Sequence, residues 1–329
     1  MKYLLVDTAN TFFRARHAAH SQSDTWDKLG FAIHVTLASV NKAWRDRGAD
    51  HVIFCLEGRS WRKDFYEPYK KNRTVARRAL TEDQAEEDQL FWDAFDALKT
   101  FLQEKTNCTV LQHKQLEADD LIAGWIQAHP SDEHTIISTD TDFYQLLSHN
   151  VRQYNGVADE LHTLDGIFDK KGKIIIDKKT KLPKTIPDPK YILFKKCLRG
   201  DPTDNVFSAF PGVREKGSKN KVGIQEAYED MDRKGFNWNN LMLQSWTDHN
   251  DVEHKVLDDY QRNRTLIDLT AQPDYVKTYI AETIATASVQ LNRPMIGAQF
   301  LKFCGKYELN RLSDNAGNFA ELLSAGYPA

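Results

Sequence analysis

The chain has 329 residues, 41% hydrophobic and 28% charged, which excludes a disordered or fibrous protein. Its 44 Lys and Arg against 47 Asp and Glu give a formal charge of −3, which would argue against a nucleic-acid partner if the charges were evenly spread. No apolar stretch approaches the roughly 18 residues of a membrane span, and Asp7 interrupts the first apolar run, so we expect neither a membrane span nor a signal peptide. The four cysteines are far apart, and we expect buried thiols in a cytoplasmic protein.

The first half of the chain alternates short apolar runs with helix-length segments. Strands are expected at residues 3–6, 51–56, 108–111 and 134–138, and amphipathic helices at 27–46 and 117–128. Because strands that alternate with helices form parallel sheets, this pattern predicts an α/β fold with a mostly parallel central sheet and flanking helices.

The alternation ends near residue 158. A Lys-rich segment follows, with a hairpin turn expected at 169–173, and the remaining pattern is helical to the end. Helices are expected at 188–200, 222–234, 253–268 and 296–308. We therefore predict an α/β domain at 1–157, an insert at 158–190 and a helical region at 191–329.

Charge is unevenly distributed along the chain. Residues 59–78 hold eight Lys and Arg against two acids, and residues 170–196 hold ten Lys against two Asp. The first basic run also contains Trp61, Phe65, Tyr66 and Tyr69, which could stack on bases. A solvated surface explains most charge runs, but a basic run with interleaved aromatics indicates nucleic-acid binding.

Acidic residues follow nearly every expected strand of the sheet. Ligands of open α/β sheets bind beyond the carboxyl ends of the strands, and that many carboxylates at one edge would repel unless cations neutralised them. Oxygen ligands without His or Cys favour Mg²⁺ or Mn²⁺. The candidate metal ligands are Asp7, Glu57, Glu117, Asp119, Asp120, Asp140, Asp142, Asp201 and Asp204.

These acids, next to a basic run, indicate metal-assisted hydrolysis of phosphodiesters. The sequence has no Gly-x-Ser-x-Gly motif, no Walker loop and no Cys/His pairing that would supply another nucleophile. For any single acid, the alternative interpretation is a helix cap.

Five segments carry distinctive motifs: Val-Asp7-Thr-Ala-Asn, Arg62 to Arg73, Glu117-Ala-Asp-Asp120, Ser-Thr-Asp140-Thr-Asp142-Phe and Gly200-Asp-Pro-Thr-Asp204-Asn205. Together they resemble the 5′ nucleases, a family of flap endonucleases, 5′–3′ exonucleases and phage ribonuclease H. The chain is most similar to the ribonuclease H branch in its length and its Tyr-Lys-Lys-Asn-Arg segment. The resemblance implies a PIN-like fold with a helical arch at 59–92 and a helix-hairpin DNA-binding module in the C-terminal region.

The resemblance also implies roles for individual residues. Two Mg²⁺ ions, replaceable by Mn²⁺, would be held by two groups of acids, with Asp120 in support. The first group is Glu57, Glu117, Asp119, Asp140 and Asp142, and the second is Asp7, Asp201 and Asp204. Lys70 and Arg73 would contact the scissile phosphate, with Arg62 and Tyr69 helping to seat it. Further nucleic-acid contacts are expected from Lys71, Arg77, Arg78, Arg214, Lys216, Lys219 and Lys221.

Two segments depart from the family pattern. Glu57 stands where the family usually has Asp, and its longer side chain changes the reach to a metal. In the expected helix-hairpin, at residues 212–219, Glu215 replaces a glycine and Lys216 replaces an apolar residue. Side chains there are therefore expected to replace backbone contacts to phosphate. For the same reason the resemblance does not carry the family's potassium site over to this segment. The insert 164–187 fits a surface loop and an additional DNA contact equally well.

The resulting hypothesis is a metal-dependent 5′–3′ exonuclease and flap endonuclease with ribonuclease H activity. It would act in replication on branched or nicked DNA and RNA–DNA hybrids with 5′ ends, as a monomer in the cytoplasm (the host's, for a phage protein), with single-strand-binding protein as a potential partner. One alternative is a PIN-type ribonuclease, which lacks the arch and the module at 200–221. The other is a non-catalytic, structure-specific DNA-binding protein.

Overall fold

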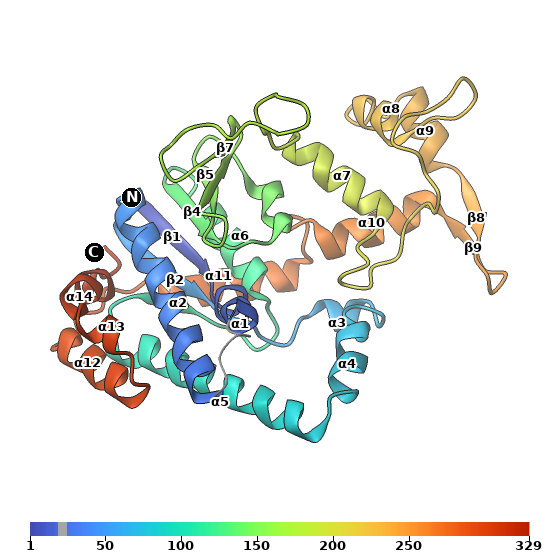
Figure 1. Cartoon of the computed structure of the whole chain (residues 1–329). Coiled ribbons are helices and arrows are strands. Elements are labelled where there is room, and N and C mark those ends of the chain that lie inside the picture. Colours follow the sequence, from blue (N-terminus) through green and yellow to red (C-terminus); the bar gives the residue numbers. More distant parts are fainter. Residues whose placement is uncertain (19–24, 329) are drawn as a thin grey trace. The chain divides into compact units, whose positions relative to one another are not determined.

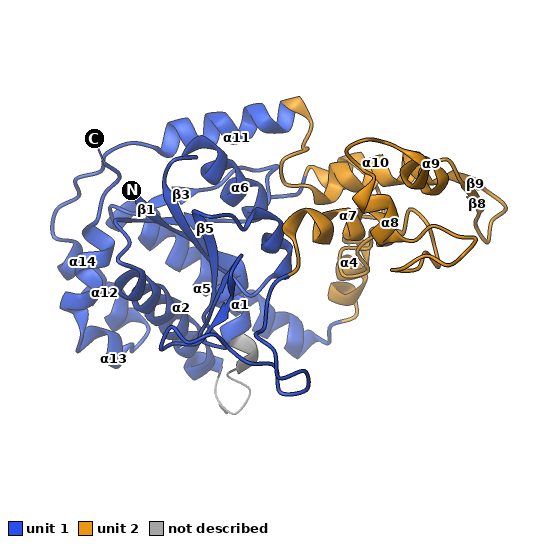
Figure 2. Cartoon of the chain, turned by 90° about the horizontal axis from the view of Figure 1, so that it is seen from above, with its two compact units in different colours: residues 1–60, 80–186, 275–329 blue, residues 61–79, 187–274 orange. Residues whose placement is uncertain are grey.

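A computed structural model describes residues 1–18 and 25–328, which form two compact units (Figure 2). Unit 1 comprises residues 1–60, 80–186 and 275–329, and unit 2 comprises residues 61–79 and 187–274. These units do not follow the expected domain boundaries, because the C-terminal segment belongs with the α/β part and the basic segment 61–79 with the helical part. No helix in the described residues is both long enough and apolar enough to cross a membrane.

Within the described residues, unit 1 is built on a seven-stranded sheet in the order β3-β2-β1-β4-β5-β6-β7 (Figure 1). The first five strands in this order are mutually parallel, whereas β6 and β7 join antiparallel. The strands are β1 (Lys2–Asp7), β2 (His51–Cys55), β3 (Thr109–Leu111), β4 (Glu133–Ile137), β5 (Val151–Asn155), β6 (Glu160–Thr163) and β7 (Gly166–Phe168). The mostly parallel sheet and the four predicted strands are confirmed; β5, β6 and β7 were not predicted.

Helices cover both faces of this sheet. They are α1 (Thr8–Ala18), α2 (Thr25–Arg47), α5 (Glu82–Lys105), α6 (Ala118–Ala128), α11 (Asp274–Ala287), α12 (Ile296–Lys306), α13 (Asn310–Ser313) and α14 (Ala316–Ser324), with a 3₁₀ helix at Thr141–Leu146. Side chains alternate along β1, so Leu4 and Val6 join a core with α2, α5, α12 and α14, while Tyr3 packs against Trp125 of α6. On that second face α11 packs closely on α6, since a Cβ on Gly124 would lie 2.1 Å from the Ile280 side chain. The result is a three-layer α/β unit.

Unit 2 is mainly helical, with a small β-hairpin. Its elements are α3 (Arg62–Phe65), α4 (Lys71–Arg78), α7 (Pro189–Arg199), α8 (Ile224–Glu229), α9 (Phe236–Met242), β8 (Ser245–Thr247), β9 (Glu253–Lys255) and α10 (Val256–Ile267). Its core packs around Phe194, Leu198, Trp238 and Tyr260. The expectation of helix throughout the C-terminal region was wrong at the β8–β9 hairpin, and α8 ends well before the predicted residue 234.

Two predicted local features can be compared with the structure. The turn at 169–173 is confirmed: the Asp169 N–H donates to Lys173 O and the Gly172 N–H donates to Asp169 O, both at 2.9 Å. The segment 59–92, expected as an arch, contains α3, α4 and the start of α5, and its residues are divided between the two units.

Candidate functional site

The predicted acids of unit 1 lie at the carboxyl edge of its sheet. Asp7 is level with Cys55 of β2, and Val6 is level with Ile137, so Ser138 follows β4 beside Asp7. The Ser138 hydroxyl donates to Asp7 Oδ2 at 2.9 Å, and the Asp140 N–H donates to Ser138 Oγ at 3.1 Å. Hydrogen bonds therefore join Asp7 to the start of the Asp140–Asp142 segment.

Several of these acids also hold local backbone. Asp7 Oδ1 accepts from the Asn10 N–H at 3.2 Å, and Asp140 Oδ1 accepts from the Asp142 N–H at 2.9 Å. Asp120 accepts from the Glu117 N–H at 3.1 Å at the start of α6. The capping interpretation is thus correct for these contacts, but a carboxylate has two oxygens with several lone pairs, so capping leaves capacity for another ligand.

The pKa of the Cys55 thiol is influenced by several of the predicted acids. Its pKa is raised well above the usual range, first by complete burial and then by the negative charges of Asp7, Asp119 and Glu57. Glu57 also accepts from the Ala118 N–H at 3.5 Å, at the start of α6. Three carboxylates from separate parts of the sequence therefore act electrostatically on the end of β2.

The donor chemistry of this edge fits a hard divalent cation, since every candidate is a carboxylate and Asp7, Glu117 and Asp120 are buried. Burying several anions together is costly without positive charge nearby. Among the described residues, however, no three His, Cys, Asp or Glu side chains form a group that could hold a metal ion. The acids share an edge without forming a closed ligand set, and the individual ligand assignments stay predictions.

Asp204 of unit 2 gathers three of the predicted catalytic side chains. Its carboxylate accepts from the Tyr69 hydroxyl at 2.9 Å and from the Arg73 guanidinium at 2.6 Å, and it lies 3.5 Å from the Lys70 ammonium. The sequence prediction placed these residues in separate roles, metal ligand and phosphate contacts. In the structure Asp204 sets the positions of both cations.

The Gly200–Asn205 loop has a backbone that depends on its first residue. Gly200 has φ +73°, and a Cβ there would lie 2.3 Å from Val206 O. Asp201 and Val206 exchange two backbone hydrogen bonds of 2.8 Å, and the Asn205 side chain donates to Pro68 O at 2.7 Å. These contacts fix the loop against the segment that carries Lys70.

Asp201 pairs with a lysine that the sequence analysis did not select. Its carboxylate lies 2.9 Å from the Lys196 ammonium. Burial opposes ionisation of Asp201, but the Lys196 charge and backbone N–H groups hold its pKa below the usual range. Lys196 could have been noticed because it lies one helical turn before the Gly-Asp motif.

Arg62 and two of the aromatic residues do not present the surface that was expected. Arg62 is 2% exposed and its Nε donates to Leu266 O at 2.7 Å, while Trp61 and Tyr69 are also buried. Burial leaves Arg62 and Tyr69 to stabilise unit 2 rather than to meet a phosphate directly, and Trp61 offers no stacking platform. Phe65, by contrast, is 46% exposed.

The expected nucleic-acid contacts on α4 and on the loop between α7 and α8 are exposed. Those residues are Lys71, Arg77, Arg78, Arg214, Lys216, Lys219 and Lys221. Lys71 also pairs with Glu67 on the surface. All seven side chains are therefore accessible to a backbone phosphate.

Glu215, one of the residues that depart from the family pattern, anchors the loop between α7 and α8 to α7. Its carboxylate lies 2.8 Å from the Lys195 ammonium and 2.9 Å from the Arg199 guanidinium. The Gly217 N–H donates to the Glu226 carboxylate at 2.9 Å, so that backbone donor already has an acceptor. Contact with phosphate through side chains in this segment stays a prediction.

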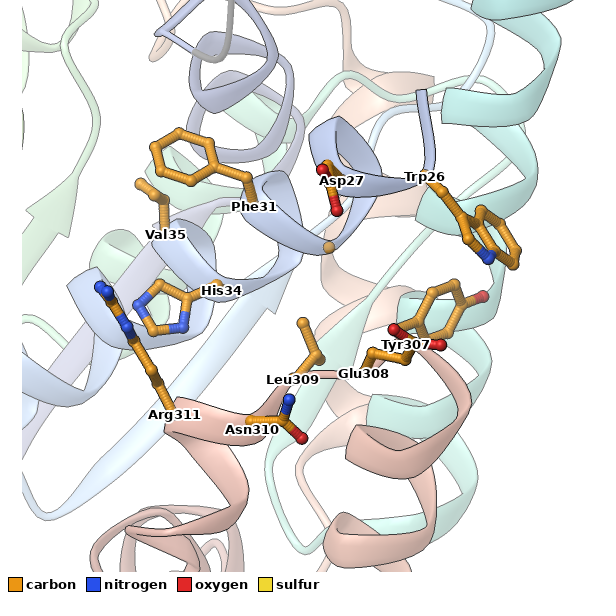
Figure 3. Close-up of a pocket in the computed structure, with 11 residues that line it drawn as sticks. Trp26, Asp27, Phe31, His34, Val35, Tyr307, Glu308, Leu309, Asn310 and Arg311 are labelled. Atoms are coloured by element: carbon orange, nitrogen blue, oxygen red, sulfur yellow. The ribbon is translucent and has the colours of Figure 1, made fainter. Parts of the chain in front are cut away.

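A pocket of about 670 Å³ lies elsewhere in unit 1 (Figure 3). It is lined by the first half of α2 and by residues 307–311, and it includes Trp26, His34 and Arg311. Burial, then the Arg311 charge, lowers the pKa of His34. None of the predicted site residues lines this pocket.

Comparison with known proteins assigns the family. The family of 5'-3' exonuclease N-terminal, resolvase-like domains matches residues 2–175. Ribonuclease H of Enterobacteria phage T4 is 27% identical over 308 residues, which cover 88% of this chain and 87% of that protein. DNA polymerase I of Rhizobium leguminosarum is 29% identical over 242 residues, but the matched part spans only 21% of the polymerase.

The fold agrees with this result. The crystal structure of the bacteriophage T5 flap endonuclease in complex with DNA and metal ions matches with a TM-score of 0.56, covering 98% of this chain and all of that one at 18% identity. The chain belongs to the 5′–3′ exonuclease family, whose members are nucleases, a class of hydrolases. The predicted resemblance and fold class are confirmed.

Proposed function

We propose that the chain is a divalent-metal-dependent 5′–3′ exonuclease and flap endonuclease with ribonuclease H activity. The observation that carries the proposal is that Asp7, at the carboxyl edge of the sheet, is joined through Ser138 to the Asp140–Asp142 segment in a member of this family. Carboxylates at one edge repel one another, and a divalent cation bound there would offset that repulsion.

The carboxylates of the edge would hold the metal. When bound there, divalent ions activate a water and stabilise the leaving oxygen of the phosphodiester. Mg²⁺ is the proposed ion, with Mn²⁺ as a substitute, because all candidate ligands are oxygen donors. Glu57, Glu117, Asp119, Asp140 and Asp142 would serve one ion, Asp7, Asp201 and Asp204 a second, and Asp120 would keep its supporting position at the start of α6.

Lys70 and Arg73 would bind the scissile phosphate. Both are already held by Asp204, so their positive charges are fixed before a substrate arrives. Preorganised cations stabilise charge that develops on the phosphate without having to reorganise during the reaction. Arg62 and Tyr69 would contribute indirectly, by holding the segment that carries the two cations.

The substrates would be branched or nicked DNA and RNA–DNA hybrids with 5′ ends. This part of the proposal is supported by the names of the relatives, which include a ribonuclease H and a flap endonuclease bound to DNA. Action in replication, a monomeric state, a cytoplasmic location and contact with single-strand-binding protein stay predictions.

The deciding experiment uses a 5′-labelled primer-template with an RNA segment followed by DNA, and a matched 5′-flap DNA. Each is incubated with the protein in Mg²⁺, in Mn²⁺ and in EDTA, and product lengths are read on a sequencing gel. We expect short 5′ products in both metals and none in EDTA. Cleavage of single-stranded RNA with no preference for a 5′ end would favour the PIN-type alternative, and binding without cleavage would favour the non-catalytic one.

A further inference from the structure

The Lys-rich segment that follows β7, residues 169–184, forms two turns. The Asp169–Lys173 turn leads into residues 174–176, which return antiparallel to β7 through the Phe168–Ile174 bridge. A second turn follows at 177–182, closed by the Asp177 N–H donating to Leu182 O at 2.8 Å. Residues 174–176 therefore extend the sheet of unit 1, with one turn before them and one turn after them.

The acids of these turns serve the backbone. Asp169 Oδ1 accepts from the N–H groups of Lys171 and Lys173, at 2.8 and 2.9 Å. Asp177 Oδ1 accepts in the same way from Lys179 and Thr180, at 2.9 and 2.8 Å. Both carboxylates therefore hold the backbone of their turns in place.

The lysines of the two turns are exposed. Those exposed on the first turn are Lys170, Lys171 and Lys173, and those exposed on the second are Lys178, Lys179 and Lys181. Among the residues that the structure describes, none of them forms an ion pair. Each turn thus presents three ammonium groups on a backbone that is fixed by hydrogen bonds.

Strand register places the first turn at the edge that carries the acids. Neighbouring strands are level at the pairs Val6–Ile137, Ile137–Tyr154, Tyr154–Leu161 and Leu161–Phe168. The next residue along β1 is Asp7, and the next after β7 is Asp169. Because β7 runs in the same direction as β1, its following turn lies at the carboxyl edge, and the turn at 177–182 lies at the opposite one.

Other contacts and spacings agree with this placement. Asp159, in the turn between β5 and β6 at the carboxyl edge, has its pKa lowered by contact with Lys42, and the charge of Lys170 adds to the effect. Strands are about 4.8 Å apart, so Phe168 lies roughly 14 Å from Ile137 and roughly 19 Å from Val6 along the sheet. The first turn is therefore several nucleotides away from the acids, since duplex phosphates advance about 3.4 Å per nucleotide on one strand.

We propose that the turn Asp169–Lys173 is a second binding site for the nucleic-acid backbone, in which Lys170, Lys171 and Lys173 contact phosphates about four to six nucleotides from the cleaved bond. The position of the cut rests on the proposed function, whereas phosphate binding by the turn does not. An acidic protein segment is the competing occupant. The shared edge favours nucleic acid, because the turn and the acids lie along the same side of the sheet.

The test compares two variants that remove the same charge from opposite edges. The edge variant is Lys170→Ala, Lys171→Ala and Lys173→Ala, and the control variant is Lys178→Ala, Lys179→Ala and Lys181→Ala. Binding of a fluorescent 5′-flap DNA is titrated in EDTA at several salt concentrations, after thermal unfolding shows that both variants fold like the parent. For the edge variant we expect weaker binding and a salt dependence shallower by about two to three in log–log slope; the control slope should change by less than about one.

Equal losses in both variants would mean a general effect of charge and would overturn the proposal. The proposal would also fail if neither variant lost affinity for the flap DNA. Binding of a polyglutamate peptide is titrated in the same way to test the competing occupant, and an edge variant that lost affinity only for this peptide would overturn the proposal. A photocrosslinker attached at Lys171→Cys should map several nucleotides from the cut, and crosslinks at the cut itself would contradict the proposed spacing. If the parent binds flap DNA but does not cleave it in Mg²⁺, the proposed function fails while the comparison of the two turns still stands.

Discussion

Asp204 holds Lys70 at both ends. The Lys70 N–H donates to Asp204 O at 2.8 Å, and the Lys70 ammonium lies 3.5 Å from the Asp204 carboxylate. Lys70 has φ +52°, a left-handed conformation that is costly for a residue with a side chain. A strained backbone at the start of α4 is therefore stabilised by the same residue that orients the Lys70 charge.

This arrangement predicts that Lys70 and Arg73 act on the rate more than on binding. Lys70→Ala and Arg73→Ala should each lower the single-turnover cleavage rate by about 100- to 1,000-fold, because their charges stabilise the transition state. The Kd for flap DNA should change much less. Lys105→Ala is the control, since Lys105 pairs with Glu104 at the end of α5 and should leave the rate nearly unchanged. Small and equal rate effects in all three variants would mean that the segment is only surface.

The Asp140–Asp142 segment should be essential for hydrolysis but not for binding. Asp140→Asn keeps an oxygen that can accept from the Asp142 N–H, yet it removes a negative charge from the edge. We expect Asp140→Asn and Asp142→Asn to lower turnover by more than about 100-fold, because loss of a ligand should exceed the effect of losing an outer partner. DNA binding should persist or strengthen, since repulsion of phosphate falls. Asp96→Asn, at an exposed ion pair with Lys99, is the control, and near-normal turnover of Asp142→Asn would refute the metal assignment.

Asp201 should make the stability of unit 2 depend on pH in acid. Its pKa is held below the ordinary 3.8 despite burial, mainly by Lys196. Because the folded-state pKa is depressed, the stabilisation is complete above the ordinary value and is lost as pH falls from there through the lowered pKa. Unfolding followed by Trp fluorescence should show this loss in the parent and a flatter acid profile in Asp201→Asn, with the variant less stable at neutral pH. Parallel acid profiles would exclude the Lys196 pair as a source of stability.

The acidic edge could be predicted because its signal is local. Asp7 and Asp140 each follow a short run of buried strand residues, and parallel strands bring such positions to one edge whatever lies between them. Cys55 could not have revealed its position among three charges, since that depends on how β1, β2 and α6 pack. Ser138 was overlooked for the opposite reason: it lies in the recognised motif, but a serine has no charge to attract attention.

The surface of the basic run could not be predicted, because burial there is decided far along the sequence. Arg62 is buried by its bond to Leu266 O, a contact 204 residues away, and Tyr69 by its contact with Asp204. A sequence of basic and aromatic residues looks the same whether it faces solvent or a distant helix. Contacts between residues far apart in the sequence also place residues 275–329 in unit 1. There Phe303 stacks on Phe101 of α5, with ring centres 4.5 Å apart.

Glu57 is the acid at which the sequence departs from its family, and its geometry suggests how the longer side chain is used. Glu57 is partly buried, contributes to the charge around Cys55, and reaches the Ala118 N–H at 3.5 Å. If the extra methylene only relocates the carboxylate, Glu57→Asp should keep activity within about threefold, because Mg²⁺ retains several waters and tolerates an outer-sphere carboxylate. Glu57→Gln should raise the Mg²⁺ concentration for half-maximal cleavage by about 10- to 100-fold, since charge is lost while size is kept. A magnesium titration of the parent and both variants on one flap substrate measures this.

A loss of activity of about tenfold or more in Glu57→Asp would show that the site is built around the longer side chain. A Glu57→Gln titration curve that overlays that of the parent would remove Glu57 from the metal site altogether.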